Sequence, residues 1–429
     1  MKKYLYVLLS IFSISYGQVF SDIEDRTLQT NLNQAYTNYQ IPSVSNPFSQ
    51  NQFVPDIALI LDFSYVGRNV SDETYKHLSI PKFIHELHHS HEGHEHKPMN
   101  FEKGFNLNYG ELSIGSTVDP YFDLFATFHL SENHFEIEEI FFNTRSLPYN
   151  FQIKAGKFRS SIGRINSQHQ HVWDFADIPL VYKVFFGDEA LREKGVQLTW
   201  LAPTDFYLLI GGEALQGENE QSFGYEAVDT FNIPQADKPN VYTGFVKSSY
   251  DIGNLTVLGG LSFITGKTRI DHTEDEDNPH AFSGDTKIYG IDLTGKYFLD
   301  SYRYISVQGE YFYRKMNGKL YENPSSPTVE NLKKKQSGYY VQLVHRFSQK
   351  WRYGIRYDSL NKNEINGVST ADNLDRYSFM VEFNTSEFAR IRFQYNYDRS
   401  KFLEGKRKNI NEFILEFNMA IGAHGAHPF

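Results

Sequence analysis

The feature that most constrains this chain is an alternation of polar and apolar residues, repeated in segments of roughly ten residues between turns. In the segment 351–358, the two alternating sets are Trp351, Tyr353, Ile355 and Tyr357 against Arg352, Gly354, Arg356 and Asp358. The segments 376–384, 389–398 and 412–419 repeat this pattern. A period of two belongs to β-strands, whose successive side chains point to opposite faces. The chain is therefore predicted to consist mainly of amphipathic strands.

Alternation alone also describes a soluble β-sandwich, so the spacing of the turns has to decide between the two folds. Short connections alternate with long ones, and the long ones are predicted at 71–100, 159–192, 215–239, 266–285, 315–336 and 360–373. Tight turns at one end and long loops at the other are typical of an outer-membrane barrel. We therefore predict an all-β fold, a transmembrane antiparallel β-barrel over residues 56–429. The segment count gives sixteen strands, with short periplasmic turns and long extracellular loops.

The N-terminus and the composition indicate export and exclude several classes of protein. Lys2 and Lys3 precede an apolar stretch, and small residues at Ser15 and Gly17 predict a signal peptide over residues 1–17. Residues 18–55 lack apolar periodicity and predict a periplasmic lead-in. The absence of cysteine excludes disulfides, and a net charge of -10 argues against a nucleic-acid partner. We expect a protein of the Gram-negative outer membrane, in contact with lipid and lipopolysaccharide and inserted by the barrel-assembly machinery.

A sixteen-stranded barrel is too wide for its own side chains to fill, which predicts a water channel. The loop 159–192 is the candidate for narrowing that channel, because an exposed loop rarely carries as many large apolar side chains as residues 178–186 do. The alternative is that this loop packs as a lid or as a trimer contact. The candidate pore-constriction residues are Arg159, Arg164, His169, His171, Asp174, Asp177, Lys183 and Arg192.

Charged residues occupy the polar face of the last predicted strands. The candidate pore-wall residues are Arg352, Arg356, Asp358, Arg376, Glu382, Arg390, Arg392, Glu412 and Glu416. Charge on a channel wall sets the local potential and hence the ion preference. Both signs occur here, so the sequence leaves the selectivity open. The alternative is a solvated surface held together by cross-strand ion pairs.

Four stretches of the sequence carry a resemblance to a known family. Residues 156–164 (GKFRSSIGR) and the closing stretch 192–198 (REKGVQL) resemble the strand, constriction loop and returning strand of the phosphate-selective porin O/P family. Residues 353–358 (YGIRYD) and 390–398 (RIRFQYNYD) are similar to its closing strands. The resemblance implies a sixteen-stranded, homotrimeric passive channel for small solutes or ions. The mixed wall charges depart from the arginine ladders and lysine clusters of phosphate-selective members.

The first long loop carries an unusual density of metal-binding side chains. Residues 85–96 read HELHHSHEGHEH, and the candidate ligands are His85, His88, His89, His91, His94 and His96. Neutral imidazole suits Zn(II) and Cu(II), and a flexible tract can gather several ligands around one ion. The alternative is a hydrophilic loop that binds no metal. The sequence requires no cofactor.

These features favour an outer-membrane porin, a passive diffusion channel, with a link to transition-metal acquisition through the His-rich loop. An energised receptor is excluded because residues 18–55 are too few to form its plug. The remaining alternatives are an outer-membrane barrel enzyme and a non-conducting surface-binding protein. No Gly-x-Ser-x-Gly nucleophile motif occurs in the chain, and we expect that the protein is not an enzyme.

Overall fold

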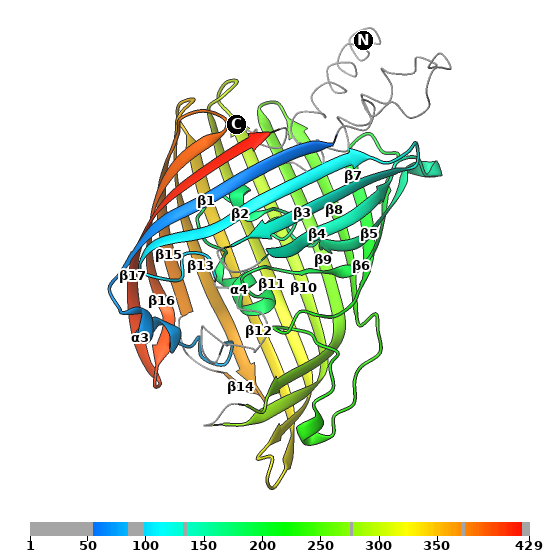
Figure 1. Ribbon diagram of the computed structural model, residues 1–429, viewed down its shortest axis with the longest axis vertical. Coiled ribbons are helices and arrows are strands. Elements are labelled where there is room, and N and C mark those ends of the chain that lie inside the picture. The colour runs from blue at the N-terminus through cyan, green and yellow to red at the C-terminus, as the bar shows by residue number, and fades with distance from the viewer. Residues whose placement is uncertain (1–54, 85–97, 132–134, 275–277, 370–373, 423–429) are drawn as a thin grey trace.

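The computed structural model describes residues 55–84, 98–131, 135–274, 278–369 and 374–422. These residues form one closed antiparallel sheet of 17 strands, of which sixteen are long and one, β14, has two residues (Figure 1). The strands are β1 Asp56–Arg68, β2 Gly104–Thr117, β3 Phe122–Leu130, β4 Phe135–Thr144, β5 Phe151–Arg159, β6 Arg192–Leu201, β7 Tyr207–Leu215, β8 Val241–Ile252, β9 Leu255–His272, β10 His280–Phe298, β11 Tyr304–Glu322, β12 Thr328–Arg346, β13 Trp351–Ile365, β14 Val368–Ser369, β15 Leu374–Asn384, β16 Ala389–Leu403 and β17 Lys406–Gly422. β1 pairs with both β2 and β17, which closes the barrel. The predicted fold class and strand count are confirmed.

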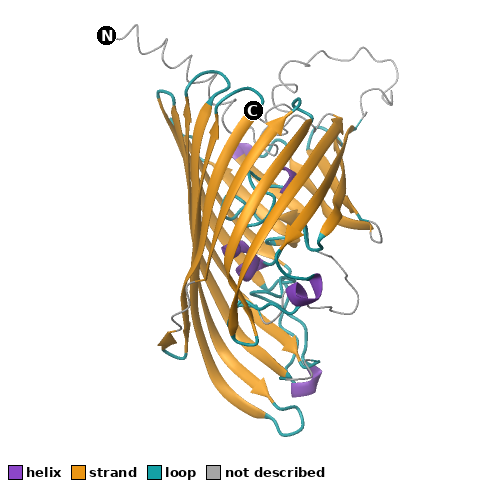
Figure 2. Ribbon diagram, turned by 90° about the vertical axis from the view of Figure 1, so that its left-hand side faces the viewer, coloured by secondary structure: helices purple, strands orange, loops and turns teal. Residues whose placement is uncertain are grey.

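Helices are few and short in the described residues. They are α3 Asp72–Lys76, α4 Leu180–Phe186 and the 3-10 turns η2 Pro148–Asn150, η3 Gln170–Val172 and η4 Asp229–Phe231. No helix in this described part of the chain has the length and apolar character needed to cross a membrane. α4 lies within the barrel, beside β11, β12 and β13 (Figures 1 and 2).

The distribution of side chains is the reverse of that in a water-soluble protein. On β13, Ile355 is 54% exposed on the outer surface, whereas its neighbour Arg356 is 3% exposed on the inner one. The end of the barrel with short turns also exposes a series of aromatic side chains: Tyr121, Tyr149, Phe206, Tyr250, Tyr302, Phe347 and Phe388. An apolar band edged by aromatic residues is the surface that a barrel presents to lipid and to the membrane interface. The outer face is therefore lipid-facing.

Three of the predicted long loops are partly strand, which corrects their boundaries. β9 continues to His272 and β10 begins at His280, so most of the predicted loop 266–285 is paired sheet. The predicted loop 315–336 shrinks to 323–327, and 360–373 contains the end of β13 and the short β14. Figure 2 shows the long strands extending beyond the rest of the barrel at one end. Outside the lipid band neither strand face has to be apolar, so alternation stops while backbone pairing continues.

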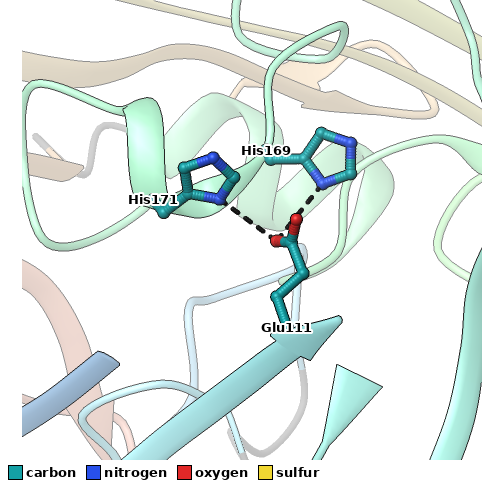
Figure 3. Close-up of side chains that lie close together, drawn as sticks. All are labelled: Glu111, His169 and His171. Carbon is teal, nitrogen blue, oxygen red and sulfur yellow. Dashed lines mark hydrogen bonds and ion pairs between the residues drawn. The ribbon is translucent and has the colours of Figure 1, made fainter. Parts of the chain in front are cut away.

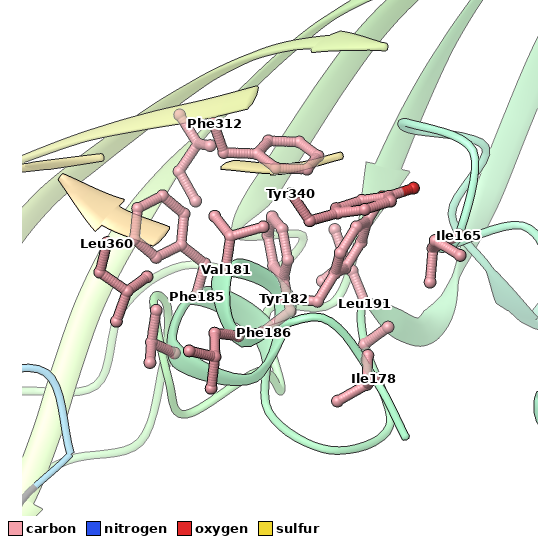
Figure 4. Packing of buried hydrophobic residues seen from close by; sticks show 14 of the residues in the cluster. Ile165, Ile178, Val181, Tyr182, Phe185, Phe186, Leu191, Phe312, Tyr340 and Leu360 are labelled. Atoms are coloured by element: carbon pink, nitrogen blue, oxygen red, sulfur yellow. The ribbon is translucent and has the colours of Figure 1, made fainter. Parts of the chain in front are cut away.

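A second apolar region lies inside the barrel, where the connection between β5 and β6 folds against the wall. Val181, Tyr182 and Phe185 of α4 are fully buried, in one cluster with Phe312 of β11 and Tyr340 of β12 (Figure 4). Burying a side chain of this size contributes about 1.5–3 kcal/mol. The connection is therefore held inside the barrel by a hydrophobic core of its own.

Candidate functional site

The connection 160–191, here named the lumenal loop, is fastened at its neck by polar side chains. Asn166 donates from Nδ2 to the carbonyl oxygens of Ser160 (2.7 Å) and Leu191 (2.9 Å), and accepts from the Leu191 amide (2.7 Å). On the wall, Glu213 of β7 accepts hydrogen bonds from the Ser161 amide (2.8 Å) and from Gln197 Nε2 (2.8 Å). These contacts join the two ends of the loop to each other and to the barrel.

Glu310 of β11 anchors the next part of the lumenal loop. Its carboxylate accepts from the backbone amides of Arg164 and Ile165, both at 2.9 Å. It also accepts from the hydroxyls of Tyr182 (2.6 Å) and Tyr340 (2.7 Å). Glu310 is 2% exposed, and these four donors satisfy a carboxylate that could not otherwise be buried.

The turn at Gly163 brings the loop backbone close to this carboxylate. Gly163 has a φ of +59°, in the left-handed region that glycine adopts readily. A Cβ atom at this position would lie 2.3 Å from Glu310 Oε2 and 2.3 Å from the Tyr182 hydroxyl. The glycine is therefore required both by its backbone conformation and by the close approach.

Arginines on the wall hold the middle of the lumenal loop. Asp177 contacts Arg356 Nη2 at 2.8 Å and Arg376 Nη1 at 2.6 Å, and it accepts from Gln394 Nε2 at 2.6 Å. Arg356 Nη1 also donates to the Asp177 carbonyl oxygen at 2.8 Å. Burial alone would raise the pKa of Asp177, but Arg356 and Arg376 lower it to about 2. The neighbouring Asp174 pairs with Arg352 at 2.5 Å.

The candidate pore-wall residues all face the interior, where each contacts a group of opposite charge, in most cases on another strand. Arg352 of β13 binds both oxygens of Glu382 on β15, at 2.6 and 2.8 Å. Arg392 of β16 lies between Glu382 (2.8 Å) and Glu416 (3.2 Å). The remaining contacts of the set are Arg390 to Glu416 at 3.2 Å, Arg376 to Asp358 at 3.3 Å, Arg356 to Asp358 at 2.9 Å and Arg68 to Glu412 at 2.7 Å. Their role in ion selectivity stays a prediction.

Five of the other candidate constriction residues contact carboxylates of their own. Arg159 and Arg192 contact Glu138 of β4, with Arg192 Nη1 at 3.5 Å from Glu138 Oε1. Lys183 pairs within the loop, with Asp188 at 2.7 Å. His169 and His171 converge on Glu111 of β2 (Figure 3). Burial alone would lower the pKa of the His169 imidazole, but the carboxylates around it, led by Glu111, raise it well above its ordinary range.

Sequence reasoning missed the wall carboxylates that contact the lumenal loop. For two of them, a β-bulge explains why both side chains face inward. Glu138 and Glu139 are consecutive on β4, yet both are buried on the inner side. The pairing of β3 with β4 shifts register here, with Thr127 opposite Glu139 and Phe128 opposite Ile137. The extra residue in a bulge re-aims a side chain that strict alternation would send outward. The adjacent pair of glutamates was the available signal in the sequence.

The His-rich tract, with candidate ligands His85, His88, His89, His91, His94 and His96, lies outside the described residues.

A closed sixteen-stranded barrel with an apolar exterior, a polar interior and a loop folded inside has the architecture of an outer-membrane porin. OmpT, an outer membrane protein of Vibrio cholerae solved in a trimer form, has this fold with a TM-score of 0.51 and 13% identity, covering 86% of this chain and 99% of that one. The outer membrane channel DcaP of Acinetobacter baumannii has a TM-score of 0.50 and 9% identity, covering 88% of this chain and 100% of that one. The fold and its lipid-facing band indicate the outer membrane of a Gram-negative bacterium.

By sequence, the chain is 55% identical over 414 residues to an uncharacterized protein of Aquifex aeolicus (strain VF5), covering 94% of this chain and 86% of that protein. The chain belongs to the same family as this protein. No family model matches the chain.

Proposed function

We propose that the protein is a passive channel of the outer membrane for small hydrophilic solutes or ions, narrowed by the lumenal loop. The observation that carries this proposal is the polar inner wall enclosed by sixteen long strands, a barrel too wide for its own side chains to fill. The lumenal loop, packed against β11, β12 and β13, supports a role in restricting the path.

Planar-bilayer recording tests the proposal directly. Purified protein in a lipid bilayer should give discrete conductance steps in KCl, and a preparation unfolded before addition should give none. If correctly folded barrels give no steps, the channel proposal is wrong and a non-conducting surface protein is favoured.

The pairing of the wall charges supports weak selectivity. Arg352, Arg356, Arg376, Arg390 and Arg392 each contact a carboxylate. A phosphate-selective channel, as the resemblance to the porin O/P family implies, requires cationic side chains that face the path without anionic partners. We therefore propose a reversal potential near zero in asymmetric KCl, and a strongly anion-selective potential would restore the phosphate-selective alternative.

We further propose that the protein assembles as a homotrimer. Support comes from the trimer form of the structurally similar OmpT, a likeness that extends to the fold alone. The test is the mass of the detergent-solubilised protein, measured by light scattering with the detergent contribution subtracted. A mass of one chain would contradict the trimer without affecting the channel proposal.

The His-rich tract is proposed to collect Zn(II) or Cu(II) at the mouth of the channel. Its support is compositional, because six imidazoles within twelve residues can supply several ligands to one ion. Calorimetric titration should show metal binding that is lost when His88, His89, His91 and His94 are changed to alanine. Unchanged binding in that variant would contradict a role for the tract.

A further inference from the structure

Inside the barrel, the lumenal loop brings two histidines to a glutamate that lies far from them in the sequence. His171 Nδ1 lies 3.1 Å from Glu111 Oε2, and His169 Nδ1 lies 3.5 Å from the same oxygen (Figure 3). Glu111 is 2% exposed, His169 8% and His171 1%. One ligand atom from each of the three residues lies within 4.8 Å of the other two. The cluster is thus compact and shielded from bulk water.

These separations match those between ligands of a tetrahedral metal ion. Ligand atoms at about 2.0–2.1 Å from such an ion lie roughly 3.3 Å from one another. The two distances to Glu111 Oε2, 3.1 and 3.5 Å, lie on either side of that value. Two imidazole nitrogens and one carboxylate form a donor set that suits Zn(II), Cu(II) and Ni(II), and catalytic zinc sites use the same set.

A second carboxylate orients one of the two imidazoles. Glu139 Oε2 lies 2.8 Å from His169 Nε2, on the side of the ring away from Glu111. Metal-binding histidines characteristically donate their other N–H to such a carboxylate, which fixes the tautomer. With the proton on Nε2, the lone pair of His169 Nδ1 faces a lone pair of Glu111 at 3.5 Å. That arrangement is repulsive unless a metal ion or a second proton on the ring lies between the two atoms.

The charge of Glu111 leads to the same conclusion. In the described residues, its ion pairs are with His169 and His171, and Ser113 Oγ donates to its other oxygen at 2.9 Å. A buried carboxylate requires a compensating positive charge, which neutral imidazoles do not provide. The charge can come from a proton on an imidazole or from a metal ion, and the convergence of one ligand atom from each of the three residues is what favours the metal.

We propose that Glu111, His169 and His171 bind one divalent transition-metal ion, of the class of Zn(II) or Cu(II), inside the barrel. Because Glu111 belongs to β2 and both histidines to the lumenal loop, the bound ion cross-links the loop to the wall. Glu138 Oε1 lies 3.7 Å from His169 Nδ1 and is a candidate further ligand, although it also contacts Arg159 and Arg192. The site is distinct from the His-rich tract.

The test starts from full-length protein in which the candidate ligands of the tract, His85, His88, His89, His91, His94 and His96, are changed to serine. After chelator treatment and dialysis, this protein should take up one Zn(II) per chain, and Co(II) should give the visible absorption of a four-coordinate site. His169→Asn with His171→Asn should abolish both signals. Glu139→Gln should weaken binding about 10–100-fold, as for other carboxylates that orient a metal-bound histidine.

A matched control is available in a second histidine pair. His272 Nδ1 and His280 Nε2 lie 3.3 Å apart where β9 pairs with β10, and changing both to asparagine should leave the stoichiometry at one. Far-UV circular dichroism and resistance to trypsin establish that each variant has folded. The proposal is overturned if the tract-free protein takes up no Zn(II), Co(II), Ni(II) or Cu(II). It is also overturned if the ion remains bound in the folded His169→Asn, His171→Asn variant. Conductance is measured separately, so failure of this proposal leaves the channel proposal untouched.

Discussion

Replacing Glu310 with glutamine tests how the lumenal loop is held. Glu310 accepts the Arg164 amide on Oε2 and the Ile165 amide on Oε1, so each carboxylate oxygen serves one fixed backbone donor. Glutamine keeps the shape but has only one oxygen, so one amide then faces an NH2 group. The hydroxyls of Tyr182 and Tyr340 can rotate to accept from that group, but a backbone amide cannot.

The expected cost of Glu310→Gln is about 3 kcal/mol, from one buried unsatisfied amide at roughly 1–3 kcal/mol and the lost charge assistance of the other bonds. Since 1.4 kcal/mol corresponds to a factor of ten, the docked state of the loop should be disfavoured roughly 100-fold. Tyr182→Phe removes one donor and leaves the carboxylate with three, so its effect should be about 1 kcal/mol.

Hydrogen exchange measured by mass spectrometry in detergent micelles is the assay. In Glu310→Gln, peptides covering residues 160–191 should exchange much faster than in the parent protein, whereas peptides from β9 and β10 should be unchanged. Single-channel current should also become noisier if the loop moves within the path. Equal exchange of the loop in the parent and in Glu310→Gln would refute the reasoning that this carboxylate anchors it.

Three further predictions address the loop and the lipid surface. Asp177 has a pKa of about 2 against an ordinary 3.8, so its contribution to docking of the loop is complete above pH 4 and is lost as the pH falls toward 2. The fluorescence of buried Trp173 should therefore shift to longer wavelength only in that range, and a shift complete by pH 5 would contradict this prediction. Gly163→Ala should loosen the loop and expose Trp173, whereas the control Gly405→Ala should cost only the local backbone strain, because Gly405 has a φ of +72° and no atom lies within 4 Å of the new Cβ. Equal effects of the two variants on the fluorescence would rule out the close approach at Gly163 as the cause of the loosening. Leu293 points outward and is 58% exposed, so Leu293→Arg should lower barrel stability in vesicles by about 2–4 kcal/mol if the residue lies near the bilayer midplane, whereas Asn254→Arg in the β8–β9 turn should not. The measurement is unfolding in urea, and equal urea midpoints for the two variants would contradict a lipid-facing Leu293.

The sequence predicted the strands well where one face must meet lipid. Around Ile355 and Arg356, the requirement for an apolar exterior and a polar interior imposes a period of two, which is visible without a structure. The same requirement ends where β9–β12 leave the lipid band, so the paired residues near Thr268 and Lys319 carry no such pattern. The prediction failed there because backbone hydrogen bonds, unlike side-chain burial, leave little trace in the sequence.

The candidate site was only partly predictable, because its contacts join residues from distant strands. The apolar composition around Phe185 indicated a loop that needs burial, and this loop does lie against the inner wall. The partners on that wall, Glu111, Glu213 and Glu310, are acidic residues on three separate strands, each without an acidic neighbour in the sequence. Nothing in the local sequence distinguishes them from solvated lumenal charges. Their roles depend on barrel closure and register, which only the structure supplies.

The paired charges of the wall have a structural consequence for the channel. Arg392 contacts Glu382 and Glu416, and its Nη2 also donates to the Trp173 carbonyl oxygen at 2.8 Å. A guanidinium with two carboxylates and a carbonyl as partners contributes little to the field in a water path, because its charge is balanced within a few ångströms. Removing one partner of such a buried group is costly, so these arginines fix the position of the loop. Ion preference in this channel would then depend on the surface that the lumenal loop turns toward water, and less on the wall behind it.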